Sequence, residues 1–267
     1  MFKSTIVFNL NHESTAKVVI NQGGTSSAKT YSILQVLYTR AVAEPNSVIT
    51  IVGQDIPNLK KGAYRDAETI YNNSEHLQGW VRSWNKTDRI IHFSNGSIME
   101  FNSYDGPQDA KNGKRDYLFV NEANGVDYAV YWQLAIRTRK QVFIDYNPSA
   151  PFWVHDNLVG TDGVQLILSD HRQNQFLSLE DHQKIESIKD PELWKVYARG
   201  LTGNITGIIY PNWQKIPDDQ FPEDEPFFGG LDFGYTNDPT AGVKIVRIGD
   251  SIFVKELCYS AGLSPMH

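Results

Sequence analysis

Residues 17–30 read KVVINQGGTSSAKT, and this stretch decides the fold. The apolar run at Lys17–Asn21 predicts a buried strand, and Thr30–Glu44 carries apolar residues at helical spacing before Pro45. Between them lies the glycine-rich segment GGTSSAKT at Gly23–Thr30. A loop that joins a strand to the start of a helix offers backbone N–H groups and the positive helix end to an anion. The sequence therefore predicts a phosphate-binding site here.

The loop carries the side chains that ATP with Mg²⁺ requires. Lys29 is placed to reach the β- and γ-phosphates, and the Thr30 hydroxyl is placed to ligate Mg²⁺. Ala28 stands where a second glycine is usual, a small change that the loop can tolerate. The candidate ATP-binding residues are Gly23, Gly24, Thr25, Ser26, Ser27, Ala28, Lys29 and Thr30. The alternative is a glycine-rich turn with an incidental Lys-Thr pair.

A second apolar stretch, YLFVNEA at Tyr117–Ala123, ends in polar residues. A triphosphatase of this type needs an acidic group near Mg²⁺ and a base that orients the attacking water, both expected at the end of a strand beside the phosphate-loop strand. Glu122 is the candidate base. Asn121 stands where Asp is expected, and it can hold a metal-bound water but lacks the negative charge that attracts Mg²⁺. Weak Mg²⁺ affinity is therefore predicted, and an ordinary strand end with an exposed Glu is the alternative.

Further apolar runs alternate with helical patterns along the chain. Strands are expected at 47–53, 90–93, 98–101, 117–120, 142–146 and 164–168, with a hairpin at Asn95-Gly96. Helices are expected at 59–71, 128–138 and 179–199, the last interrupted by Pro191. Strands that alternate with helices predict an α/β fold with a mostly parallel sheet flanked by helices, as in P-loop nucleoside-triphosphatases.

Composition excludes some classes of protein. The chain has 267 residues, of which 40% are hydrophobic, and this is enough for a packed core. The net charge of −6 argues against a protein that coats nucleic acid through its bulk charge. The single cysteine, Cys258, allows no internal disulfide, and no apolar run is long enough to predict a membrane span or a membrane partner.

The amino-acid composition of the sequence changes after residue 210. Pro211–Pro226 is rich in proline and acidic residues and is expected to be a linker. Strands are expected after it at 227–233, 241–247 and 251–258. We therefore expect a phosphate-binding domain at 1–210, a linker at 211–226 and a β-rich segment at 227–267.

These motifs together resemble the large terminase subunit of tailed bacteriophages and prophages. PNLKKGAYRD at 57–66, IIHFSNGSIMEF at 90–101 and FIDYNPS at 143–149 are similar to segments of that family. The resemblance implies an ATP-hydrolysing motor that moves double-stranded DNA into a procapsid. It also implies a homo-oligomeric ring on a portal protein, a small-subunit partner and work in the cytoplasm of the bacterial host. Within FIDYNPS, the resemblance makes Asn147 the candidate that senses the γ-phosphate and couples hydrolysis to movement.

The C-terminal part resembles the opening of the family's nuclease domain, which has an RNase H-like fold. GGLDFGYTNDPTAG at 229–242 places Asp232 on a first strand as a ligand of a two-metal site for Mg²⁺ or Mn²⁺. Asp238 and Glu256 are weaker candidates. The resemblance implies further acidic ligands well downstream of His267, so an incomplete RNase H-like segment and no DNA cleavage are expected.

The chain also departs from the family, because Thr25 stands where an arginine is usual. Charge for the reaction is then expected from a neighbouring subunit, for which Lys111, Lys114 and Arg115 are candidates, although a solvated loop also explains them. Two other functions stay open. One is a metal-dependent DNA nuclease with a regulatory phosphate-binding domain. The other is a degenerate, non-hydrolysing docking module, which Thr25, Ala28 and Asn121 favour.

Overall fold

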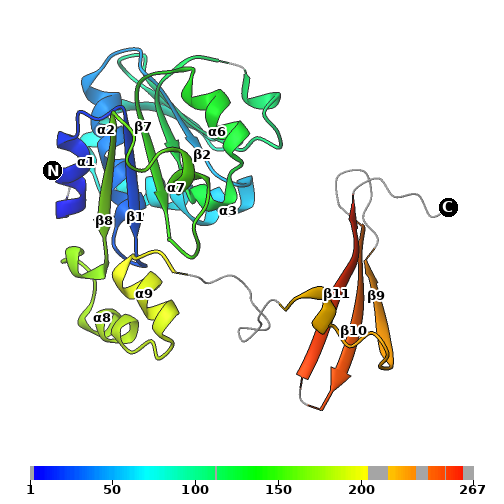
Figure 1. The fold of residues 1–267 in the computed structure, drawn as a ribbon. Coiled ribbons are helices and arrows are strands. Elements are labelled where there is room, and N and C mark those ends of the chain that lie inside the picture. Colours follow the sequence, from blue (N-terminus) through cyan, green and yellow to red (C-terminus); the bar gives the residue numbers. More distant parts are fainter. Residues whose placement is uncertain (1–2, 112, 204–215, 233–239, 250, 261–267) are drawn as a thin grey trace. The chain divides into compact units, whose positions relative to one another are not determined.

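The computed structural model describes residues 3–111, 113–203, 216–232, 240–249 and 251–260. The chain divides into two compact units, Met1–Gly207 and Ile208–His267 (Figure 1). Within the described ranges, no helix is long and apolar enough to cross a membrane. Each unit is described by itself below.

The first unit is built on an eight-stranded sheet in the order β3-β4-β5-β2-β6-β7-β1-β8. Its strands are β1 (Val18–Gly23), β2 (Val48–Val52), β3 (Val81–Asn85), β4 (Ile90–Phe93), β5 (Ile98–Asn102), β6 (Arg115–Val120), β7 (Thr138–Tyr146) and β8 (Val164–Ser169). Along this order, every neighbouring pair from β5-β2 to β1-β8 is parallel. The pairs β3-β4 and β4-β5 are antiparallel. The predicted α/β fold with a mostly parallel sheet is thus confirmed, and β3 is a strand that was not expected.

Helices cover the sheet, and several differ from the predicted ranges. They are α1 (Ile6–Glu13), α2 (Lys29–Ala43), α3 (Ile56–Lys61), α4 (Ala63–Asn72), α5 (Glu75–Trp80), α6 (Tyr128–Ala135), α7 (Trp153–Asn157), α8 (Leu179–Glu186) and α9 (Pro191–Arg199). The helix expected at 59–71 is wrong as one element, because Gly62 separates α3 from α4. The helix expected at 179–199 is two helices, because Pro191 is the first residue of α9 and Asp190 caps it. Helix α6 ends at Ala135, and Thr138 already belongs to β7.

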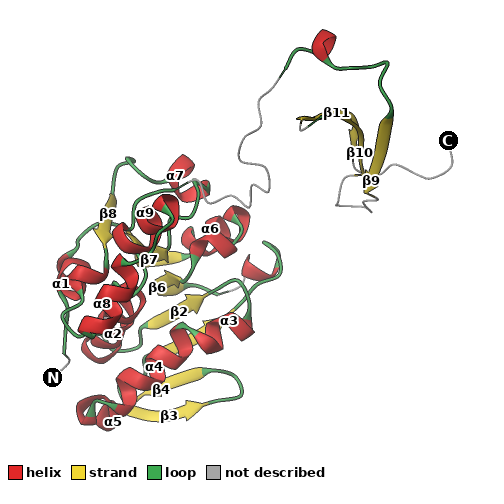
Figure 2. Ribbon diagram, turned by 90° about the horizontal axis from the view of Figure 1, so that it is seen from below, coloured by secondary structure: helices red, strands yellow, loops and turns green. Residues whose placement is uncertain are grey.

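The core lies on both faces of the sheet, because neighbouring strand residues point to opposite sides. Val19 and Phe143 belong to the cluster that packs against α2 and α4. Ile20 and Ile144 belong to the cluster that packs against α6 and α7. The two pairs of helices lie on opposite faces of the sheet (Figure 2). The strands β1, β6 and β7 are therefore buried on both sides over most of their length, and their polar residues concentrate at the strand ends.

The second unit contains three antiparallel strands, β9 (Phe227–Asp232), β10 (Thr240–Ile248) and β11 (Ser251–Ser260), with β10 in the middle. They agree with the three expected strands. Part of the expected linker is attached to this sheet, because the Glu223 carboxylate accepts hydrogen bonds from Lys244 at 2.6 Å and Lys255 at 2.5 Å. The RNase H-like assignment stays a prediction.

Candidate nucleotide-binding site

The predicted motifs meet at one edge of the sheet, where β1, β7 and β6 all end. Parallel pairing aligns Ile20 of β1 with Ile144 of β7, and Ile144 with Val120 of β6. The loop after β1, the polar end of β7 and Asn121-Glu122 after β6 are therefore neighbours. The expectation that the acidic strand lies beside the phosphate-loop strand was wrong, because β7 lies between them.

The phosphate loop adopts a conformation that presents its backbone to a ligand. Ser26 and Ala28 have φ values of +57° and +63°. The left-handed region costs a non-glycine residue about 1–2 kcal/mol, which explains why glycine is usual at the position of Ala28. Within the described residues, the N–H groups of Ser26, Ser27 and Ala28 donate no hydrogen bond, and the buried Ser27 hydroxyl has no partner. These open donors directly precede helix α2 and fit a phosphate group.

The start of the loop packs against the end of α9. Gly24 donates its N–H to the Ser169 carbonyl and Thr25 donates its N–H to the Tyr197 carbonyl, both at 2.9 Å. A Cβ atom on Gly24 would lie 2.3 Å from the Tyr197 carbonyl oxygen. Gly24 is therefore required for this close backbone approach.

Gly24→Ala is expected to lower the free energy of unfolding by about 1–3 kcal/mol, because the extra methyl group forces two backbone segments apart. Gly79→Ala is the matched control, since a Cβ on the exposed Gly79 of α5 meets nothing within 4 Å. That control should be neutral or stabilising by up to about 1 kcal/mol. Urea denaturation of both variants measures the difference, and equal stabilities would contradict the packing argument.

Lys29 connects the loop to the end of β7. Its side chain is only 6% exposed, and its Nζ donates to Asn147 Oδ1 at 2.6 Å and to the Gly24 carbonyl at 3.3 Å. Burial lowers the pKa of Lys29, while the charges of Asp145 and Glu122 oppose that change. The structure thus brings the candidate residues Lys29 and Asn147 into direct contact.

A buried carboxylate that was not among the predicted site residues, Asp145, organises the rest of the site. Thr30 donates its hydroxyl hydrogen to Asp145 Oδ2. Asn121 Nδ2 donates to Asp145 Oδ1 at 3.0 Å, and the Glu122 N–H donates to the same oxygen at 2.8 Å. Asp145 is fully buried. The signal that could have identified it is an acidic residue inside the otherwise apolar strand VFIDY, at 142–146.

Glu122 projects from a strained turn at the end of β6. Its φ of +51° places it in the left-handed region, where a non-glycine residue at a strand end often marks a functional position. Solvent reaches its side chain, yet desolvation by the surrounding protein still raises the pKa of its carboxyl, and the charge of Asp145 adds to this rise. Within the described residues, its carboxylate makes no hydrogen bond. It is therefore free to accept one from a water molecule.

Oxygen atoms and negative charge at this edge fit Mg²⁺. The Thr30 hydroxyl and the side chains of Asn121 and Asp145 lie together, and such hard oxygen donors are what Mg²⁺ prefers. The charge of Asp145 also acts on Asp66 of α4: burial, and after it this charge, raise the pKa of the Asp66 carboxyl to about 6. In the ranges that the structure covers, no three His, Cys, Asp or Glu side chains form a metal cage.

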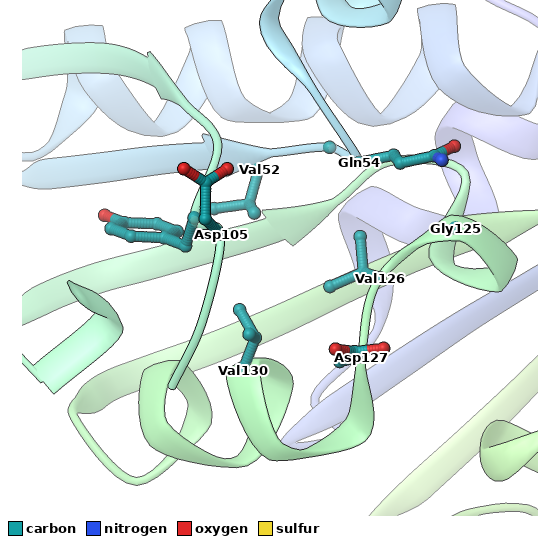
Figure 3. Close-up of a pocket in the computed structure, with 9 residues that line it drawn as sticks. Val52, Gln54, Asp105, Gly125, Val126, Asp127 and Val130 are labelled. Carbon is teal, nitrogen blue, oxygen red and sulfur yellow. The ribbon is translucent and has the colours of Figure 1, made fainter. Parts of the chain in front are cut away.

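A cavity of about 230 Å³ lies at the carboxyl end of β2, separate from the phosphate loop (Figure 3). It is lined by Val52, Gly53, Gln54, Tyr104, Asp105, Gly125, Val126, Asp127 and Val130. The 3-10 turn Ala123–Gly125 connects Glu122 to this wall. None of the phosphate-loop residues lines it, so the cavity is a neighbour of the site and not its phosphate pocket.

The basic residues before β6 differ in their surroundings. Arg115 is the first residue of β6, is buried and donates to the Leu134 carbonyl at 3.1 Å, so the expectation of a loop position for it was wrong. Lys111 is exposed and its Nζ donates to Gln108 Oε1 at 2.6 Å. Lys114 is exposed as well. Only the two lysines remain candidates for reaching another subunit.

The candidate nuclease residues do not form a cluster among the described positions. Asp232 is exposed at the end of β9, opposite Ala241. Glu256 lies on β11, with β10 between it and Asp232. Asp238 lies outside the described residues. A metal site at Asp232 stays a prediction.

Comparisons with known proteins agree with this architecture. The large terminase of a thermophilic bacteriophage has a TM-score of 0.66 at 15% identity, over 94% of this chain and 68% of that one. It has also been solved in complex with ADP, with a TM-score of 0.66 at 14% identity over the same shares of the two chains. The large terminase ATPase domain of a Thermus phage has a TM-score of 0.56 at 15% identity, over 74% of this chain and 93% of that domain.

At these identities the structural likeness shows the fold alone, and no curated protein sequence matches the chain. The sequence model of the phage terminase large subunit, however, matches residues 15–201. That match extends from just before β1 to just after α9 and includes the whole candidate site. The chain belongs to the phage terminase large subunit family.

Proposed function

We propose that the chain is an ATP-hydrolysing motor that drives double-stranded DNA into a viral procapsid. One observation carries this proposal: the Lys29–Asn147 contact and the hydrogen bonds of Asp145 join the phosphate loop, the acidic strand end and the end of β7 in a single site. A degenerate docking module would have no need for an exposed Glu122 beside a loop in which the N–H groups of Ser26, Ser27 and Ala28 donate no hydrogen bond among the described residues.

The residues of the site suggest their own roles. The loop N–H groups and Lys29 would bind the phosphates of ATP, and Thr30 and Asn121 would hold Mg²⁺, Asn121 through a water molecule. When bound, Mg²⁺ would neutralise charge that develops on the β- and γ-phosphate oxygens. Glu122 accepts a hydrogen bond from the attacking water and aligns it with the γ-phosphate. In hydrolysis the water oxygen would bond to the γ-phosphorus while the bond from that phosphorus to the β–γ bridging oxygen breaks. Glu122 would take the proton that the water releases, and ADP and inorganic phosphate would leave.

Asn147 is suited to report the nucleotide state. In this structure Lys29 Nζ donates to Asn147 Oδ1 at 2.6 Å. A γ-phosphate competes with Asn147 for the same ammonium group, so the contact weakens when ATP binds and returns after phosphate leaves. The end of β7 would thereby change its hydrogen bonding once in each cycle of hydrolysis.

The partners follow from the proposed motor. A portal protein, a terminase small subunit and further copies of the chain in a ring would be needed to apply force to DNA, and the work would take place in the bacterial cytoplasm. Lys111 and Lys114, exposed beside the start of β6, are candidates to supply positive charge to a neighbouring copy.

Phosphate release from ATP, measured with and without double-stranded DNA, tests the proposal. Plasmid nicking is followed in the same tubes, with Glu122→Ala as the inactive control. We expect DNA-stimulated phosphate release that Glu122→Ala removes, without nicking. Nicking that persists without ATP hydrolysis would favour the nuclease, and nucleotide binding without hydrolysis would favour the docking module.

A further inference from the structure

The proposed magnesium site has an uncharged residue, Asn121, at the position where a negatively charged aspartate is usual. Asn121 follows β6, where an aspartate would be expected, and an amide carries no net charge. Because Mg²⁺ is attracted mainly by anionic oxygens, the sequence predicted weak binding. The structure shows a carboxylate within hydrogen-bond distance of both Asn121 and Thr30, on a different strand.

We propose that Asp145 supplies the negative charge of the magnesium site, acting through the hydroxyl of Thr30, in place of the carboxylate that Asn121 lacks. This inference rests on the proposed function. Thr30 directs its hydrogen at Asp145, so the lone pairs of its oxygen stay available for a cation. A carboxylate that accepts a hydrogen bond from a metal ligand orients that ligand and increases its electron density.

The surroundings of Asp145 fix this arrangement. Its second oxygen accepts hydrogen bonds from Asn121 Nδ2 and from the Glu122 N–H, so the carboxylate is anchored to the end of β6. The side chain is fully buried, which raises the pKa of its carboxyl, whereas the charge of Lys29 and the hydrogen bonds from Thr30, the Glu122 N–H and Asn121 favour its ionised form. Asn121 is then a positioning residue, because its amide donates a hydrogen bond to Asp145. The negative charge of the site comes from Asp145 on β7.

The inference can be tested with variants that move the carboxylate from position 145 on β7 to position 121 at the end of β6. Asp145→Asn is isosteric and can still accept the hydrogen bonds from β6, but it removes the charge. The double variant Asn121→Asp/Asp145→Asn returns one carboxylate to the site from the other strand. Asn121→Asp alone places two carboxylates side by side, and one of them then tends to keep its proton.

The measurement compares ADP affinity in Mn²⁺ with ADP affinity in EDTA, using a fluorescent ADP analogue, because the ratio isolates the contribution of the metal. Asp145→Asn is expected to lower this ratio by about 10–100-fold. The double variant should recover most of the loss, and Asn121→Asp alone should give no increase. Asp116→Asn is the matched control, since Asp116 is also a buried carboxylate of this sheet but lies at the start of β6.

Equal ratios for Asp145→Asn and the parent would overturn the inference, as would a loss that the double variant does not recover. A parent chain that binds ADP in neither condition would instead refute the proposed function. The two failures are therefore distinguishable.

Discussion

Glu122→Gln is expected to lower the turnover number for ATP hydrolysis by at least about 100-fold, because a positioned general base contributes about 10²–10⁴-fold to such reactions. Glutamine keeps the size of the side chain but cannot take a proton from water. The affinity for ATP should stay within a few-fold, since the proposed phosphate contacts come from the loop and Lys29 and not from Glu122.

Steady-state phosphate release gives the turnover number, and binding of a fluorescent nucleotide gives the affinity. Asp127→Asn is the matched control, because Asp127 is an exposed acidic residue only five positions further along the chain. It should leave both quantities unchanged. Should Glu122→Gln hydrolyse ATP at the parent rate, another residue must orient the water.

Lys29→Met is expected to weaken nucleotide binding by on the order of 100-fold or more. A hydrogen bond to a charged group contributes about 1.5–3 kcal/mol, and an ammonium that contacts two phosphates makes at least two of them. Methionine retains the apolar stem of the side chain, so the packing around this buried position is preserved. The chain should remain folded, because the substitution also removes a charge whose burial is unfavourable.

Calorimetry with a non-hydrolysable ATP analogue and Mg²⁺ measures this loss. Lys17→Met is the control, because the Lys17 ammonium also donates to backbone carbonyls, those of Thr138, Arg139 and Lys140, but at the opposite end of the sheet. Its nucleotide affinity should equal that of the parent. An unchanged affinity in Lys29→Met would show that the loop is not part of the nucleotide-binding site.

Much of the fold could be predicted because its signals are local. The run at Lys17–Asn21, the loop at Gly23–Thr30 and the Asn95-Gly96 hairpin each depend on neighbours in sequence, and all three lie where expected. The division between α3 and α4 at Gly62 was missed, because a glycine inside a helical pattern is compatible with a continuous helix.

The composition of the site was less predictable, because it depends on strand order. Nothing in the local pattern of β7 shows that it inserts between β1 and β6, so Asp145 could not be assigned to the site from sequence. Its contact with Thr30 spans 115 positions of the chain. Lys29, Thr30 and Glu122 could be proposed from sequence because each stands inside a short motif, whereas Asp145 joins the candidate site only through tertiary pairing.

Gly200, the last-turn glycine after α9, has a φ of +64°, and a Cβ there would lie 2.7 Å from the Gly24 nitrogen and 2.9 Å from the Gly23 Cα. Its carbonyl also accepts a hydrogen bond from Gln22 Nε2 at 2.8 Å. The point where the chain leaves α9 is thus in backbone contact with the nucleotide loop. Any displacement of that loop during a catalytic cycle must either shift the exit of α9 or break these contacts. These contacts involve the main chain of Gly23, Gly24 and Gly200 and the side chain of Gln22, so most side-chain changes on the exposed face of α9 would leave them intact.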